Sequence, residues 1–83
     1  MNKRYLNELA EAVLNLGDRK NTIDFLEGIL TQKELSEISL RLQIVKRLKA
    51  GEPQRKIADQ LGVGIATITR GSKELQLGRF KNV

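Results

Sequence analysis

The residues best suited to chemistry lie close together, between residues 54 and 73. The first part of this segment carries an amide and two cations, and the second carries two threonines, an arginine and a lysine. Arginine pairs with guanine or phosphate, hydroxyls bond to phosphates, and threonine methyls fit against thymine methyls. The segment therefore predicts contact with DNA, with these candidate residues: Gln54, Arg55, Lys56, Gly64, Ile65, Ala66, Thr67, Thr69 and Lys73.

The spacing within residues 54–70 is that of a helix-turn-helix. An eight-residue helix precedes Gly62, which suits a left-handed turn, and Val63 follows to fill the corner. The apolar residues expected to face inward are Ile57, Ala58, Leu61 and Ile68. This arrangement leaves the start of the second helix free to enter a major groove. An ordinary helical hairpin would explain Gly62, but not the combination of Thr67, Thr69 and Arg70.

The charge distribution agrees with a phosphate-binding partner. The net charge is +5, and residues 42–83 hold nine Lys/Arg against three Asp/Glu, whereas residues 1–41 hold six against seven. A basic half beside a neutral half is typical of nucleic-acid binding, although a solvated basic face would look the same. The chain has no histidine and no cysteine, and it shows no phosphate-cradling glycine loop. An enzyme or a zinc site is therefore the least supported class.

Helical periodicity accounts for most of the chain, and no segment is typical of a strand. The predicted helices cover about residues 6–14, 22–30, 31–49, 54–61 and 65–76. Gly17 should stop the first helix, and the second should begin near Asn21 or Thr22. Thr31 and Glu34 have the spacing of a capping box at the start of the third.

Proline and glycine positions define the remaining boundaries. Gly51 should close the third helix, and Pro53 is expected at the first position of the fourth. Gly71 lies within the fifth helix, where it costs up to about 1 kcal/mol relative to alanine, so a local reason for it is needed. Residues 77–83 are expected to be frayed.

These elements predict a single all-α domain over residues 1–83. Residues 1–51 would form the scaffold and dimerisation part, and residues 53–76 the helix-turn-helix. The core must be aliphatic, because only three residues are aromatic. A small aliphatic domain without disulfides often gains stability by pairing with itself, so we expect a homodimer. No apolar run is long enough to cross a membrane and no signal peptide is recognisable, which favours a cytoplasmic location.

Two sequence runs, LTQKELSEISLRLQIV and GVGIATITRGS, closely resemble the tryptophan operon repressor family. The similarity covers roughly residues 30–75, and the ending Arg-Gly-Ser is unusual among other helix-turn-helix proteins. This resemblance implies an intertwined, all-helical homodimer that binds a double-stranded DNA operator. It also implies that L-tryptophan acts as a corepressor by holding the DNA-reading helices in the competent orientation.

The resemblance also implies a tryptophan pocket with these residues: Leu30, Thr31, Arg41, Arg70, Gly71 and Glu74. Arg41 and Arg70 would flank the indole, and one of them would also hold the carboxylate together with Thr31. The Leu30 carbonyl would receive the amino group, and Gly71 would leave room beside the ligand. Guanidinium planes can sandwich an aromatic ring and bind a carboxylate with two bonds. Alternatively, both arginines are surface charges.

The sequence departs from the family pattern in three respects. Glu74 stands where the family has a serine, which brings a charge to the ligand's amino group. The loop over residues 51–53 is one residue shorter than the family's loop. The family's C-terminal helix has no counterpart in this sequence, and the N-terminal arm is short. Two alternatives therefore stay open: a ligand-independent helix-turn-helix DNA-binding protein, and a helical homodimeric interaction protein that does not bind DNA.

Overall fold

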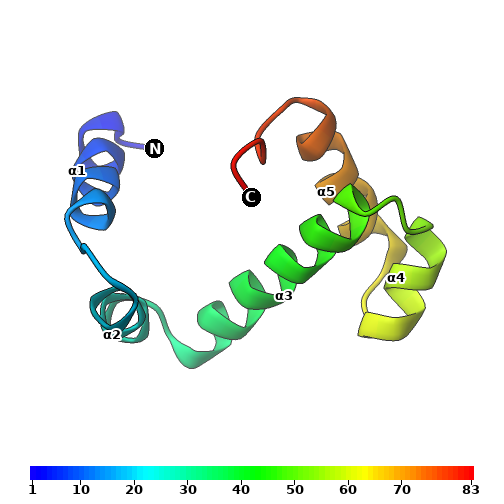
Figure 1. Ribbon diagram of the computed structural model, residues 1–83, viewed down its shortest axis with the longest axis horizontal. Helices are drawn as coiled ribbons and strands as arrows, with labels where there is room; N and C mark the ends of the chain where they lie inside the picture. Colours follow the sequence, from blue (N-terminus) through cyan, green and yellow to red (C-terminus); the bar gives the residue numbers. More distant parts are fainter. The chain divides into compact units, whose positions relative to one another are not determined.

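The computed structural model describes residues 1–83 as five α-helices without a strand (Figure 1). The helices are α1 (Lys3–Leu14), α2 (Arg19–Ile29), α3 (Gln32–Lys49), α4 (Gln54–Leu61) and α5 (Ile65–Gln76). This confirms the predicted all-α class. The chain divides into two compact units, Met1–Leu35 and Ser36–Val83. The division into a scaffold over residues 1–51 and a helix-turn-helix over residues 53–76 stays a prediction.

The first unit holds α1 and α2, and side-chain caps begin both helices. The Asn2 side chain accepts the backbone N–H groups that start α1. Asp18 does the same for α2, accepting from the Asn21 N–H at 2.8 Å. The prediction that α2 begins near Asn21 or Thr22 was therefore wrong, because the Asp18 carboxylate satisfies a first-turn amide and starts the helix earlier. Neither helix buries a residue.

The start of α3 has the predicted capping box. The Glu34 N–H donates to the Thr31 hydroxyl at 3.1 Å, and the Thr31 N–H donates to the Glu34 carboxylate at 2.9 Å. Hydrogen bonding to the Glu34 carboxylate, first from the Thr31 backbone and then from the Thr31 side chain, lowers the pKa of Glu34. The helix then continues into the second unit and ends at Lys49, ahead of Gly51, whose φ is +82°.

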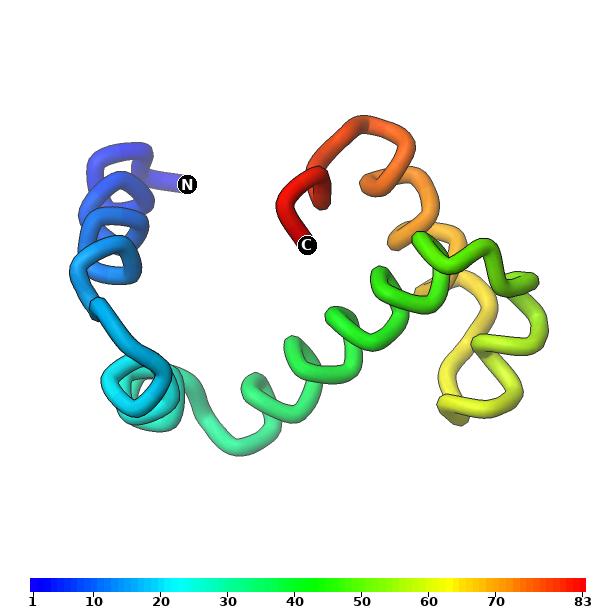
Figure 2. Tube along the Cα trace, in the orientation of Figure 1, coloured from blue at the N-terminus to red at the C-terminus, as the bar shows by residue number.

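The core of the second unit forms where the last turns of α3 meet α4 and α5. Its buried members are Ile44, Ile57, Ala58 and Ile68, with Leu48, Leu61 and Val63 packed against them. The turn between α4 and α5 is visible in Figure 2, with Gly62 in the left-handed region at φ +68°. The predicted inward-facing residues and the turn glycine of the helix-turn-helix are thus confirmed.

Two local predictions were wrong. Pro53 precedes α4 as its N-cap, with extended φ and ψ of −61° and 138°, rather than occupying the first helical position. Residues 77–82 form successive turns instead of a frayed end, and these turns include Gly78, whose φ is +80°. They are held because the Lys49 ammonium donates to the Phe80 carbonyl at 2.9 Å and the Phe80 ring is half-buried.

Candidate nucleic-acid interface and pocket

The candidate DNA face comes from the outer sides of α4 and α5. Ile68 is completely buried and anchors α5, so that the residues around it point away from the core. The exposed residues of the predicted set are Arg55, Lys56, Gly64, Ile65, Ala66, Thr67, Thr69 and Lys73, while Gln54 is half-buried. Helix packing thus leaves hydroxyls, cations and small apolar groups available together, which are the groups that contact phosphates and base edges.

A side-chain hydrogen bond joins the two helices on this face. The Thr69 hydroxyl lies 3.0 Å from the Gln54 side-chain oxygen and 3.0 Å from the Ile65 carbonyl. A hydroxyl has one proton to donate, so these two acceptors share it. The Gln54 amide nitrogen is left to donate to an outside acceptor. The two predicted DNA-contacting residues therefore also contact each other.

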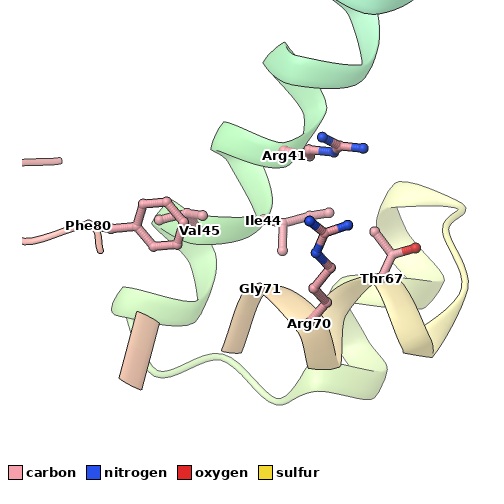
Figure 3. Close-up of a pocket in the computed structure, with 7 residues that line it drawn as sticks. All are labelled: Arg41, Ile44, Val45, Thr67, Arg70, Gly71 and Phe80. Atoms are coloured by element: carbon pink, nitrogen blue, oxygen red, sulfur yellow. The ribbon is translucent and has the colours of Figure 1, made fainter. Parts of the chain in front are cut away.

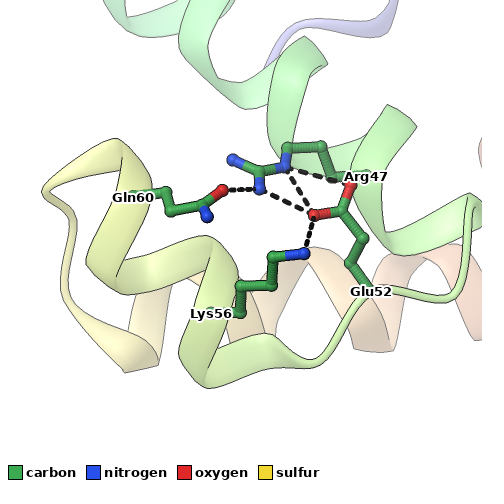
Figure 4. Close-up of polar contacts among 4 residues, drawn as sticks. All are labelled: Arg47, Glu52, Lys56 and Gln60. Carbon is green, nitrogen blue, oxygen red and sulfur yellow. Dashed lines mark hydrogen bonds and ion pairs between the residues drawn. The ribbon is translucent and has the colours of Figure 1, made fainter.

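A polar cluster lies at the corner between α3 and α4, formed by Arg47, Glu52, Lys56 and Gln60 (Figure 4). The Arg47 Nε lies 3.0 and 3.2 Å from the two Glu52 oxygens, and its Nη2 lies 2.7 Å from one of them. The same Nη2 donates to the Gln60 side-chain oxygen. Hydrogen bonds from Arg47 lower the pKa of Glu52. We call these four residues the corner cluster.

A pocket of about 160 Å³ opens between α3 and α5 (Figure 3). Its lining residues are Arg41, Ile44, Val45, Thr67, Arg70, Gly71 and Phe80. Arg41 and Arg70 lie at one end, near Thr67, whereas the Phe80 ring lies beside Val45 at the other. The fold therefore brings together two arginines that are far apart in the sequence.

The pocket's chemistry suits an anion that carries an apolar ring. Two guanidinium groups and a hydroxyl supply donors, the remaining walls are mostly aliphatic or aromatic, and no carboxylate lines the pocket. Its volume is similar to that of an apolar cavity of about 150 Å³ that accepts benzene. An aromatic ring therefore fits, with its acidic group directed toward the arginines.

Gly71 has a packing role that the sequence did not reveal. A Cβ atom added there would lie 3.4 Å from side-chain carbons of both Ile44 and Leu48. These distances are at the near edge of ordinary contact, so Gly71 lies where α5 passes beside α3. Gly71 also lines the pocket, where a longer side chain would take up space.

The other residues predicted for the pocket are Leu30, Thr31 and Glu74. Glu74 does not line the pocket, and its carboxylate pairs with Arg79 at 3.5 Å. Leu30 and Thr31 belong to the first unit, so their part in the pocket stays a prediction. Sequence reasoning missed Phe80, because the sequence predicts a frayed end over residues 77–83. The available signal was a rare aromatic residue shortly after a turn-forming glycine, Gly78.

No group of acidic side chains is arranged to hold a metal ion. None of the helices combines the length and the apolar character that crossing a membrane requires.

Together, the buried core, the left-handed turn and the exposed face of α5 define a helix-turn-helix protein that binds DNA. The family model described as Trp repressor protein matches residues 4–81. The chain belongs to the Trp repressor family, and it is a DNA-binding transcriptional repressor. This family comprises regulators rather than enzymes.

The relatives are curated proteins named Trp operon repressor homolog. The one from Vibrio vulnificus (strain YJ016) is 41% identical over 71 residues, covering 84% of this chain and 70% of the relative. The one from Vibrio campbellii (strain ATCC BAA-1116) is 39% identical over 70 residues, covering 83% and 70%. The Vibrio cholerae relative (serotype O1, strain ATCC 39315 / El Tor Inaba N16961) is 51% identical over 52 residues, covering 61% and 50%. No solved structure matches the chain.

Proposed function

We propose that this repressor binds a palindromic DNA operator as a homodimer and uses L-tryptophan as its corepressor. The observation that carries the proposal is the pocket, in which Arg41 of α3 and Arg70 of α5 meet. Tryptophan offers an aromatic ring for the guanidinium groups and a carboxylate for bidentate hydrogen bonding. Curated relatives named Trp operon repressor homolog support the same ligand.

The position of the pocket suggests how the ligand acts. One wall is the scaffold helix α3 and the other is α5, the helix that carries the candidate DNA face. A ligand that contacts both walls stabilises the orientations of α5 in which both contacts form. By the family resemblance, the Leu30 carbonyl and the Thr31 hydroxyl would complete the site around the ligand's amino and carboxylate groups.

On the DNA side, we propose that the N-terminal part of α5 enters the major groove while the start of α4 contacts the backbone. The nine residues of the predicted set would make these contacts. Thr67 has two possible roles, because its exposed side chain also lines the pocket. Bound ligand and DNA would therefore meet at the first turn of α5.

The apolar surface of the chain supports the homodimer. The helices α1 and α2 bury no residue, although large apolar side chains recur along them. Those from 42% to 54% exposed include Leu6, Leu9, Val13, Ile23 and Ile29 in these helices, and Ile38 and Leu42 in α3. Apolar stripes need cover to be stable in water, and a second copy of the chain would provide it. Two copies would also supply the two reading helices that a palindrome requires.

Isothermal titration with L-tryptophan tests the ligand. We expect heat of binding for the wild type and its loss in Arg70→Ala. The matched control is Arg19→Ala, which removes an arginine that does not line this pocket. Absence of heat in the wild type at millimolar tryptophan would contradict the corepressor proposal.

One observation favours a second candidate, a repressor that needs no ligand. Glu74, at the family's serine position, is paired with Arg79 and is not part of the pocket lining. The serine contact to the ligand's amino group is therefore not replaced directly. Gel shifts on a palindromic duplex, with and without L-tryptophan, separate the candidates. Equal shifts in both conditions would support the ligand-independent repressor.

A further inference from the structure

Glu52 is an acidic residue in the basic half of a DNA-binding protein. Only three acidic residues occur in residues 42–83, and Glu52 lies next to Lys56 of the candidate DNA face. A carboxylate near phosphates repels DNA, so a benefit must offset this cost. We propose that Glu52 is a positioning residue for DNA binding: together with Arg47, it fixes the orientation of α4 on the scaffold helix α3.

The contacts of the corner cluster connect three parts of the second unit. Arg47 extends from the last turn of α3 and binds the Glu52 carboxylate through both Nε and Nη2 (Figure 4). Its Nη2 also donates to Gln60 in the last turn of α4. One guanidinium group therefore ties the loop before α4 and the end of α4 to the scaffold helix. The role rests on the proposed DNA face, which includes the start of α4.

The corner cluster supplies a directional constraint that the apolar core lacks. Ile44 of α3 belongs to the same buried cluster as Ile57 and Ala58 of α4, so the two helices share one apolar core. Apolar contacts are non-directional, so they permit small rotations of one helix on another. A planar guanidinium group that is bonded to two acceptors has a defined geometry. Arg47 therefore restricts the rotation of α4 that would move its first turn relative to DNA.

The distances decide between positioning and a competing role for Glu52. As a competitor, Glu52 would neutralise Lys56 and weaken DNA binding. The Lys56 Nζ lies 3.9 Å from the carboxylate, however, and its side chain is 54% exposed, so this pair is loose and solvent-screened. The Arg47–Glu52 contact is 2.7 Å, with side chains only 20% and 27% exposed. Removing the Glu52 carboxylate therefore breaks the close contact with Arg47, but it changes the charge that Lys56 offers to DNA very little.

The two roles predict opposite signs for Glu52→Gln, which raises the net charge by one. The probe is a duplex selected from random DNA by the wild-type protein, assayed with L-tryptophan at two salt concentrations. We expect the DNA affinity of Glu52→Gln to fall about five- to tenfold, the size of effect that follows the loss of one charge-assisted contact. The matched control is Asp59→Asn, which makes the same charge change at an exposed position of α4. Its affinity should stay equal or rise slightly.

A charge swap separates positioning from loss of folding. The double variant Arg47→Glu with Glu52→Arg can restore the ion pair, and Gln60 can then donate through its amide nitrogen. We expect its DNA affinity to return to within about threefold of the wild type, with a thermal midpoint above the assay temperature. An increase in affinity for Glu52→Gln, or no recovery in the swap, would overturn the positioning role alone. If the wild type selected no duplex, that result would contradict the proposed DNA face itself, and the positioning role that rests on it.

Discussion

Thr69 has two possible contacts on the proposed DNA face through a single hydroxyl. It is exposed on α5, where a phosphate or base edge could reach it, yet it bonds to Gln54 of α4. This contact holds the Gln54 side chain in place and leaves its amide nitrogen free to donate. On the proposed DNA face, Thr69 would therefore act through Gln54 as well as by direct contact.

The substitution Thr69→Val removes the hydroxyl and keeps the side-chain volume. We expect DNA affinity to fall about fivefold, because Gln54 loses its internal partner. Thr69→Ser keeps the hydroxyl and should stay close to the wild type. A double-mutant cycle with Gln54→Ala, measured by fluorescence anisotropy, tests the coupling. Strictly additive losses would show that the two residues act on DNA independently.

At the scale of secondary-structure elements, α3 connects the parts of the second unit. Three positions along it have different roles. Arg41 lines the pocket, Ile44 lies in the core, and Arg47 bonds to Glu52 in the corner cluster. Its two ends are secured by polar contacts, the capping box at Thr31 and the bond from Lys49 to the Phe80 carbonyl. A single helix therefore links the pocket to the corner cluster before α4.

Acid titration reports on the contact that secures the end of α3. The pKa of Glu52 is lowered by hydrogen bonds from Arg47, so this contribution to stability is full above pH 4.5, the ordinary value. It is lost as the pH falls through the lowered pKa. Thermal midpoints of the wild type and Glu52→Gln should therefore differ at pH 7 and converge as the pH falls below 4.5 through the lowered pKa. A difference that stayed constant over this range would exclude the ion pair as its source.

At the scale of the whole molecule, charge and apolar surface point to two kinds of partner. The net charge of +5 favours DNA, and the uncovered apolar stripes of α1 and α2 favour a second copy. The two associations are linked in the proposed function, because a palindromic operator presents two half-sites about one helical turn apart. Salt dependence can therefore report both DNA contact and the number of copies bound.

Lys73 is exposed on α5 and belongs to the proposed DNA face. Each lysine–phosphate contact changes the slope of log affinity against log salt by about 0.9. Lys73→Gln should therefore reduce the steepness of this slope by about 1.8 for a homodimer and about 0.9 for a monomer. The control is Lys20→Gln in the first unit, which should leave the slope unchanged. An unchanged slope for Lys73→Gln would remove this residue from the DNA face.

Local signals in the sequence were enough to determine the helices and the helix-turn-helix. Apolar periodicity, the Thr31–Glu34 spacing and Gly62 act within a few residues, so their effects can be predicted without the fold. The errors at Asp18 and Pro53 concerned which neighbouring residue caps a helix. Only the family resemblance placed Arg41 and Arg70 in one pocket, because periodicity says nothing about which exposed side chains of different helices meet.

The tertiary structure decided the contacts between helices. It placed the Phe80 ring at one end of the pocket, paired Thr69 with Gln54, and bonded Arg47 to both Glu52 and Gln60. These contacts depend on the angles and distances at which helices cross, and those follow from the packing of the whole unit. The residue types of the DNA face are thus a property of the sequence, whereas the side chains that orient it emerge only once the helices are packed.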